Sequence, residues 1–298
     1  MNVWIQAARL RTLPLAFAVI ILGSGMAMAR GAFDPLVFTL ALLLSTVFQV
    51  LSNYANDLGD GLRGTDANKK GEQRAVASGA ISATAMNRAV NGLTMLAAVL
   101  VAVLTGISFD YYVWIITFNL LGAFAVWAAR SYTMGKNPYA YWGGGDLFVI
   151  IFFGWVGVMG SELLFIQEPS PMSFFPATVA GLLSAAVLTL NNLRDQKGDK
   201  AAGKITLVVR YGEAWGRSYF KWLLIGAMGL NMFYAAFIYL STTNLYPFAV
   251  QLLLGIAARS MRDKVKAVHN LKDFDPLLKP MAIITLLYCV LTAVALNL

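Results

Sequence analysis

The chain has 298 residues, of which 58% are hydrophobic and 13% are charged, and its formal net charge is +8. Soluble domains carry about 25% charged residues, so this composition excludes an ordinary soluble protein and indicates an integral membrane protein. The single cysteine excludes an internal disulfide, and the division of the basic residues among loops of an apolar chain disfavours nucleic-acid binding. We expect residues 1–298 to form one membrane-embedded domain.

Nine apolar segments are each long enough to cross a bilayer as an α-helix, which needs about 20 residues. Their apolar runs are continuous, and lipid requires every backbone polar group to be bonded within the segment, so helices are favoured over a barrel. We therefore predict an all-α membrane protein with about nine transmembrane helices. The expected segments are residues 12–30, 36–57, 84–106, 111–129, 145–165, 173–193, 219–241, 246–261 and 278–297.

Lysine and arginine residues lie almost entirely in alternate loops. With the N-terminus in the cytoplasm, all of the 23 basic residues except Arg30 fall on the cytoplasmic side. The positive-inside rule therefore predicts a cytoplasmic N-terminus and a multi-pass protein of the cell inner membrane. Arg9 and Arg11, followed by an apolar stretch that ends in "AMA", also fit a cleavable signal peptide, an alternative that the orientation does not decide.

A cluster of carboxylates, "NDLGDGLRGTD" at 56–66, follows the second apolar segment. Asn56 and Asp60 are four residues apart and therefore share one face of a helix. Gly64 occupies the next position of this series, and an aspartate appears two residues later, at Asp66. Because glycines loosen the end of the helix, we expect a bent loop to bring Asp66 back toward the same site.

A second cluster, "NNLRDQKGD" at 191–199, follows the sixth apolar segment. Asn191, Asp195 and Asp199 are spaced four apart, and aligning the two clusters places Asp195 opposite Asp60. This weak internal repeat suggests two related halves that face each other across a cavity. All the candidate ligands are oxygen atoms, so the expected ion is Mg²⁺ rather than zinc.

Basic residues crowd the loops that carry both acidic clusters. Mg²⁺ usually shares its coordination shell with substrate phosphates, so carboxylates, basic residues and Mg²⁺ together indicate a diphosphate site. The alternative is that the acidic residues only cap helices and balance a basic surface. The residues that we assign to the diphosphate are Lys69, Arg74, Lys136, Lys197 and Lys204.

The segment "ARSYTMGKNPYAYWGGGD" at 129–146 lies on the same side. Tyr132 and Lys136 are four residues apart. An aromatic belt at the membrane interface accounts for Tyr139 and Tyr141. Asp146 opens an apolar helix, where a carboxylate suits either the helix dipole or a functional role. A later stretch, "GKITLVVRYG" at 203–212, is rich in β-forming residues and could form a lid over the second cluster.

Six ordered segments, "RLRTLP", "NYANDLGDGLRGTD", "QRAVASGAIS", "YTMGKNPYAYWGGGD", "NNLRDQKGD" and "GKITLVVRYG", resemble the UbiA-type intramembrane prenyltransferases. The resemblance covers nearly the whole chain and is strongest to the 1,4-dihydroxy-2-naphthoate branch of menaquinone synthesis. It implies helices around a central cavity that opens to lipid. A cation-coupled transporter is the main alternative from another class, but both acidic clusters lie at helix ends on one side.

The resemblance also implies functional roles. It implies Mg²⁺-dependent transfer of a polyprenyl chain from polyprenyl diphosphate to 1,4-dihydroxy-2-naphthoate with loss of CO₂, at a membrane surface that faces the cytoplasm; 4-hydroxybenzoate is the alternative acceptor. Gly64 departs from the family's Asn-x3-Asp-x3-Asp pattern, which makes Asp66 the substitute ligand. The implied metal ligands are Asn56, Asp60, Asp66, Asn191, Asp195 and Asp199, the catalytic residues are Tyr132, Lys136 and Asp195, and the residues for the aromatic substrate are Arg9, Tyr132, Tyr139 and Asp146.

Overall fold

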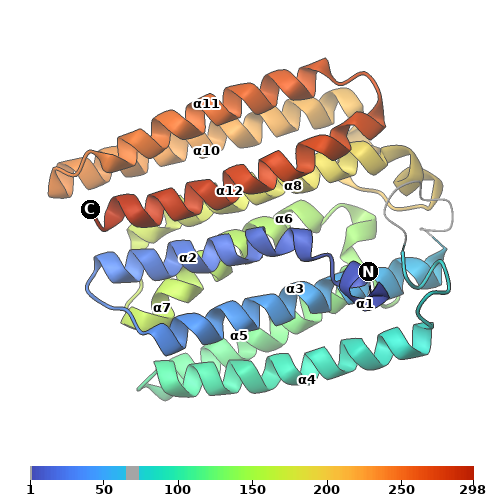
Figure 1. Cartoon of the computed structure of the whole chain (residues 1–298), viewed down its shortest axis with the longest axis horizontal. Coiled ribbons are helices and arrows are strands. Elements are labelled where there is room, and N and C mark those ends of the chain that lie inside the picture. Colours follow the sequence, from blue (N-terminus) through green and yellow to red (C-terminus); the bar gives the residue numbers. More distant parts are fainter. Residues whose placement is uncertain (1, 65–73) are drawn as a thin grey trace.

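The computed structural model describes residues 2–64 and 74–298, and its long helices lie side by side in one bundle (Figure 1). This confirms the predicted all-α membrane fold. The helices longer than one turn are α1 (Val3–Ala8), α2 (Leu13–Ala29), α3 (Pro35–Arg63), α4 (Ala83–Ser108), α5 (Tyr112–Ser131), α6 (Gly145–Ile150), the π-helix η3 (Ile151–Met159), α7 (Gly160–Ile166), α8 (Phe174–Ala201), α9 (Leu207–Tyr211), α10 (Glu213–Thr242), α11 (Tyr246–Ala267) and α12 (Asp275–Leu296). Short 3₁₀ turns include η2 (Tyr139–Trp142) and η5 (Leu271–Phe274).

Eight helical segments of the described chain are long and apolar enough to cross a membrane. They coincide with eight of the nine segments that the sequence predicts. The ninth, 246–261, corresponds to α11, which packs against α10 and α12 (Figure 1). The second half of α11 is charged from Arg259 onward, so its crossing of the membrane stays a prediction.

Helix α8 lies at the centre of the larger core and packs against α10, α12 and η3. Small residues allow this close contact. A Cβ atom added to Gly181 would lie 2.9 Å from the carbonyl oxygen of Ile150, and one added to Gly154 would lie 2.7 Å from that of Ala177. Helix α3 forms the other side of the bundle, where it packs against α4, α2 and α5. The C-terminal ends of α3 and α8 therefore carry the two acidic clusters on opposing parts of one bundle.

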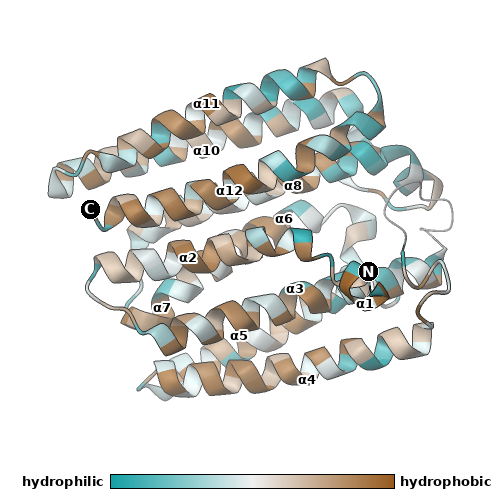
Figure 2. Cartoon of the chain, in the orientation of Figure 1, coloured by the Kyte–Doolittle hydropathy of each residue, from teal (hydrophilic) through white to brown (hydrophobic). Residues whose placement is uncertain are grey.

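The polar residues gather at the end of the bundle where α1 and the connecting loops lie (Figure 2). The N-terminus lies toward this end and the C-terminus lies at the other (Figure 1). Both acidic clusters are at the polar end, as the sequence predicts. The compartment that this end faces stays a prediction.

The segment 203–212, expected to be β-rich, forms no strand: Leu207–Tyr211 is the helix α9, and residues 204–206 before it have no regular structure. Thr206 caps the N-terminus of α9 by accepting a hydrogen bond from the backbone of Val209, and Gly212, with a φ of 91°, ends the helix. Val208 is buried between α8 and α10, and the Gln196 side chain donates to its carbonyl oxygen at 3.0 Å. The expectation was wrong because β propensity mainly reflects packing on a sheet, whereas these valines pack against helices.

Candidate active site

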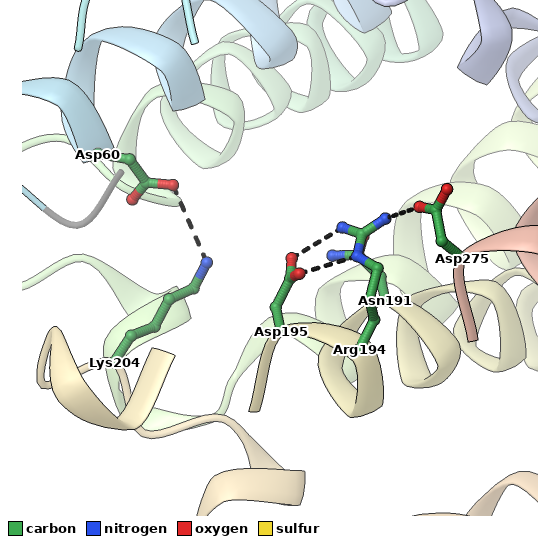
Figure 3. A network of polar contacts seen from close by, with 6 residues as sticks. All are labelled: Asp60, Asn191, Arg194, Asp195, Lys204 and Asp275. Carbon is green, nitrogen blue, oxygen red and sulfur yellow. Dashed lines mark hydrogen bonds and ion pairs between the residues drawn. The ribbon is translucent and has the colours of Figure 1, made fainter. Parts of the chain in front are cut away.

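The first acidic cluster lies on the last turns of α3. The Asp60 side chain is only 3% exposed, and two groups from distant loops approach its carboxylate. The Tyr141 hydroxyl donates to Oδ1 at 3.1 Å, and Lys204 Nζ lies 4.0 Å from Oδ2. Figure 3 shows Asp60 and Lys204 pointing toward one another. Asn56, one turn earlier, accepts a hydrogen bond from the Thr133 hydroxyl at 3.3 Å.

Asp57, between Asn56 and Asp60, has a structural role. Its buried carboxylate accepts hydrogen bonds from the backbone nitrogens of Ala75 at 3.0 Å and Val76 at 2.9 Å. These bonds fasten the chain that follows Arg74 to α3. The chain from Arg74 onward is therefore held beside α3 by a carboxylate that lies off the face shared by Asn56 and Asp60.

The second cluster lies on the last turns of α8. Arg194 binds both oxygens of Asp195 at 2.8 Å through Nε and NH2, and its NH2 also donates to Asn191 Oδ1 at 2.6 Å. Its NH1 reaches Asp275, at the start of α12 (Figure 3). Arg194 thus links the acidic face of α8 to α12. Asp199 is buried, and its carbonyl oxygen accepts a hydrogen bond from the Lys204 backbone.

Lys204 lies between the two clusters. Its side chain is 11% exposed. Burial alone would lower the pKa of Lys204, but Asp60, Asp199, Tyr141 and Asp195 outweigh it and hold the pKa above its ordinary value. The ammonium group is therefore charged and neutralises carboxylates of both helices.

Tyr132 lies next to this charged centre. Lys204 Nζ is 5.8 Å from the centre of its ring. Burial raises the pKa of Tyr132, and the charges of Asp60 and Asp199 raise it further, whereas Arg9 lowers it. The Tyr132 hydroxyl is therefore protonated at neutral pH and can donate a hydrogen bond.

The aromatic side chains continue from Tyr132 into the bundle. The Tyr139 ring lies edge-on to Tyr132 at 5.2 Å and stacks on Phe148 at 4.0 Å. The Tyr139 hydroxyl donates to the carbonyl oxygen of Ala128 at 2.9 Å, so this tyrosine is held by the end of α5. Phe148 and Phe152 extend the aromatic wall along α6 and η3.

Two cavities adjoin the charged centre. The polar one, of about 1040 Å³, is lined by Arg9, Arg74, Lys197 and the acidic face of α8. The apolar one, of about 400 Å³, runs among the membrane helices and includes Asn56, Tyr132 and Tyr139 in its lining. A lipid-like molecule with a charged head could therefore place its head in the polar cavity and its chain in the apolar one.

A model of the UbiA prenyltransferase family matches residues 16–277. The chain belongs to this family. It is 42% identical over 226 residues, 76% of this chain and 73% of the relative, to the 1,4-dihydroxy-2-naphthoate octaprenyltransferase of Escherichia coli (strain K12). The protein of the same name from Haemophilus influenzae is 37% identical, and the match covers 99% of this chain and 96% of the relative. The family resemblance seen in the sequence is thereby confirmed.

Solved structures of UbiA homologues share the fold. A homologue from Archaeoglobus fulgidus bound to DMAPP and Mg²⁺ superimposes with a TM-score of 0.68, covering 97% of this chain and 99% of the homologue at 16% identity. The homologue from Aeropyrum pernix K1 gives a TM-score of 0.68 at 15% identity. At these identities the similarity concerns the fold alone.

The sequence also assigns Lys136, Asp146, Asp66 and Lys69 to the site. Lys136 is exposed in a turn after α5 and lines neither cavity. Asp146 is buried in the first turn of α6 and hydrogen-bonds to Tyr219 of α10. Its charge also acts on Tyr132, so it lies near the site while it joins α6 to α10. Asp66 and Lys69 lie outside the described residues.

Two residues of the site, Tyr141 and Asp57, have no functional role in the sequence prediction. Tyr141 fits an interfacial aromatic belt equally well, and only the fold brings its hydroxyl to Asp60. Asp57 does carry a signal, since it is the one carboxylate of "NDLGD" that lies off the face shared by Asn56 and Asp60.

The acidic residues suit a magnesium ion in their chemistry. The donors on α3 and α8 are carboxylate and amide oxygens, which are the ligands that Mg²⁺ prefers. The cations of Lys204 and Arg194 already lie against these carboxylates, so the cluster attracts positive charge. No three Asp, Glu, His or Cys residues of the described chain lie close enough to form a metal site alone, and Mg²⁺ ordinarily completes its shell with water and substrate phosphates.

Proposed function

We propose that this protein transfers a polyprenyl chain from a polyprenyl diphosphate to 1,4-dihydroxy-2-naphthoate, with loss of CO₂, to give demethylmenaquinone. The observation that carries the proposal is the position of Lys204 beside residues of two cavities: Asp199 lines the polar cavity and Tyr132 lines the apolar one. The relatives named 1,4-dihydroxy-2-naphthoate octaprenyltransferase, similar over most of the chain, support the choice of acceptor.

The polar cavity provides the groups for a diphosphate. Arg74 and Lys197 line it, and Lys204 adjoins it with a protonated ammonium group. Cations placed around the leaving diphosphate stabilise the negative charge that develops on it as the allylic C–O bond breaks. Asp57 contributes indirectly, because its bonds to the backbone hold the segment of Arg74 at this site.

A magnesium ion would be held by the two acidic clusters, and when bound it supplies further positive charge to the leaving diphosphate. The proposed ligands are Asn56, Asp60, Asn191, Asp195 and Asp199. Asp66 stays a proposed ligand from the sequence. Tyr141 orients the Asp60 carboxylate by occupying one of its oxygens, so that the other faces Lys204.

The apolar cavity receives the polyprenyl chain, and its aromatic wall faces the reacting carbon. The allylic cation that forms when the diphosphate leaves is stabilised by aromatic faces, and Tyr132 and Tyr139 offer such faces at the inner side of the charged centre. The mostly apolar lining of this cavity disfavours water, which protects the cation from hydrolysis. The ring carbon that bears the carboxylate attacks the cation, a C–C bond forms, and the carboxylate leaves as CO₂.

The acceptor's carboxylate is assigned to Arg9. This residue lines the polar cavity, and its charge acts on Tyr132. Its backbone has a φ of 49° at the junction of α1 and the following turn, a conformation that is uncommon for a residue other than glycine.

We further propose that the polar end faces the cytoplasm from the cell inner membrane, since the basic loops lie there.

The experiment is a prenyl-transfer assay with membranes that contain this protein. Formation of the prenylated lipid should require Mg²⁺, a polyprenyl diphosphate and 1,4-dihydroxy-2-naphthoate. Substrate labelled in its carboxyl group should release one labelled CO₂ for each lipid formed. Better turnover of 4-hydroxybenzoate, or a product that keeps its carboxylate, would show that the assigned acceptor is wrong.

A further inference from the structure

A stripe of polar residues runs along α3 into the apolar cavity. Ser45, Gln49, Ser52 and Asn56 follow one another at spacings of four, three and four residues, so they share one face of the helix, and Asp60 continues the series. The first four are half-buried and line the apolar cavity. A polyprenyl chain has no hydrogen-bonding group and does not explain this stripe.

The remainder of the cavity wall is mostly apolar. Phe118, Phe148 and Phe152 line it from α5, α6 and η3. A polar side chain inside a membrane protein is costly without a partner, and such residues usually face a cavity where they bind something. The stripe is therefore a candidate for contacts with a ligand that carries hydroxyl groups.

Two members of the stripe already have hydrogen bonds. The Ser45 hydroxyl donates to the carbonyl oxygen of Ala16 at 3.0 Å, and Asn56 accepts from Thr133. The side chains of Gln49 and Ser52 make no hydrogen bond with any other residue of the described chain. These two are one turn apart on the cavity side of α3, so their polar groups can meet a single ligand atom from adjacent positions.

Arg9 lies close to the mouth of this stripe. Helix α1 crosses α3 near Asn53, whose side-chain nitrogen donates to the carbonyl oxygen of Ala8 at 2.8 Å. Arg9, the next residue, is therefore at the level of Asn53. Gln49 lies four residues deeper along α3, which is roughly 6 Å at about 1.5 Å per residue. A fused aromatic ring system can extend over this depth.

We infer that Gln49 and Ser52 bind the 4-hydroxyl group of the aromatic acceptor while its carboxylate lies toward Arg9. The inference rests on the proposed function. Glutamine offers both a hydrogen-bond donor and an acceptor, and serine offers a hydroxyl that can do either, so the pair matches a phenolic hydroxyl. The ring lies with its hydroxyl edge against α3, and its opposite side faces the aromatic wall. These two residues select a dihydroxy ring over a monohydroxy ring.

The test compares two acceptors in wild type and in the variants Gln49→Met and Ser52→Ala. The reactive acceptor is 1,4-dihydroxy-2-naphthoate, measured by its KM, and the analogue is 1-hydroxy-2-naphthoate, measured as a competitive inhibitor by its Ki. Wild type should prefer the dihydroxy ring, because a site built to bond a hydroxyl discriminates against a ligand without it. In each variant the ratio of Ki to KM should fall by about tenfold, as expected for one lost hydrogen bond. The Ki itself should change by less than about threefold.

Thr46→Val is the matched control. Thr46 lies on α3 beside the stripe, its hydroxyl donates to the carbonyl oxygen of Leu42 at 2.8 Å, and it does not line the cavity. The control should keep the wild-type ratio. An unchanged ratio in both Gln49→Met and Ser52→Ala, or a wild type that binds both rings equally well, overturns the inference. Failure of the wild type to prenylate the dihydroxy acceptor would instead refute the proposed function.

Discussion

Replacing Lys204 by methionine removes the cation that lies between the two acidic helices. Its Nζ is 4.0 Å from Asp60 Oδ2, and both side chains are nearly buried. Deleting one partner of a buried ion pair costs roughly 3–5 kcal/mol. Tyr141 still donates to Asp60, so we expect the lower end, about 3 kcal/mol. At about 2 °C or more per kcal/mol, the melting temperature should fall by roughly 6 °C.

Magnesium should restore much of this loss. A divalent cation at the acidic clusters supplies the positive charge that Lys204 otherwise provides, and a ligand that binds only the folded state stabilises it. Thermal unfolding of detergent-solubilised protein, with and without Mg²⁺, should show a larger Mg²⁺ shift for Lys204→Met than for wild type. Prenyl transfer should decrease because a diphosphate contact is lost.

Lys200→Met is the control, since Lys200 is exposed on the last turn of α8. Lys200→Met should change neither the melting temperature nor the Mg²⁺ shift.

The pKa of Lys204 in the folded state is raised. The stabilisation by Lys204 is therefore present below the ordinary lysine pKa and is lost only as the pH rises through the raised value. The difference between wild type and Lys204→Met should therefore be constant between about pH 6 and 9. A variant as stable as wild type without Mg²⁺ would refute the reasoning.

Three further predictions concern the acidic site and the topology. Asp60→Asn and Asp195→Asn should each reduce turnover far more than tenfold; a tenfold loss corresponds to about 1.4 kcal/mol in barrier height. Activity within tenfold of wild type would show that the replaced aspartate is not a metal ligand. Tyr141→Phe should raise the Mg²⁺ concentration for half-maximal activity by about 10–100-fold, because it frees the Asp60 carboxylate; an unchanged Mg²⁺ titration would contradict its orienting role. Cysteines placed at Lys200 and Lys272 in a cysteine-free background should resist an impermeant thiol reagent in intact cells, and labelling from outside would reverse the predicted orientation.

The helices were accessible from the sequence because lipid enforces long, continuous apolar runs. The acidic clusters were accessible because the four-residue spacing within each defines a helix face. The position of Lys204 between Asp60 and Asp199 was not accessible from the sequence, because it depends on how a loop folds back onto two helices. The helical conformation of Leu207–Tyr211 was missed because the conformation of Val208 is set by its packing against α8 and α10 rather than by its own propensity.

The paired cavities explain why the carboxylates lie at the end of a hydrophobic helix. A polyprenyl diphosphate has a strongly charged head and an apolar chain, and its reacting carbon lies at the junction. In this protein the corresponding boundary lies between Lys204 and Tyr132, whose ring centre is 5.8 Å from the ammonium group. In the proposed reaction, cations on one side stabilise the departing diphosphate, and on the other side the stacked rings of Tyr139 and Phe148 form an apolar wall beside the allylic cation. If the boundary lay deeper, the diphosphate would lose its hydration in lipid. If it lay farther out, water would capture the cation before the acceptor ring could attack.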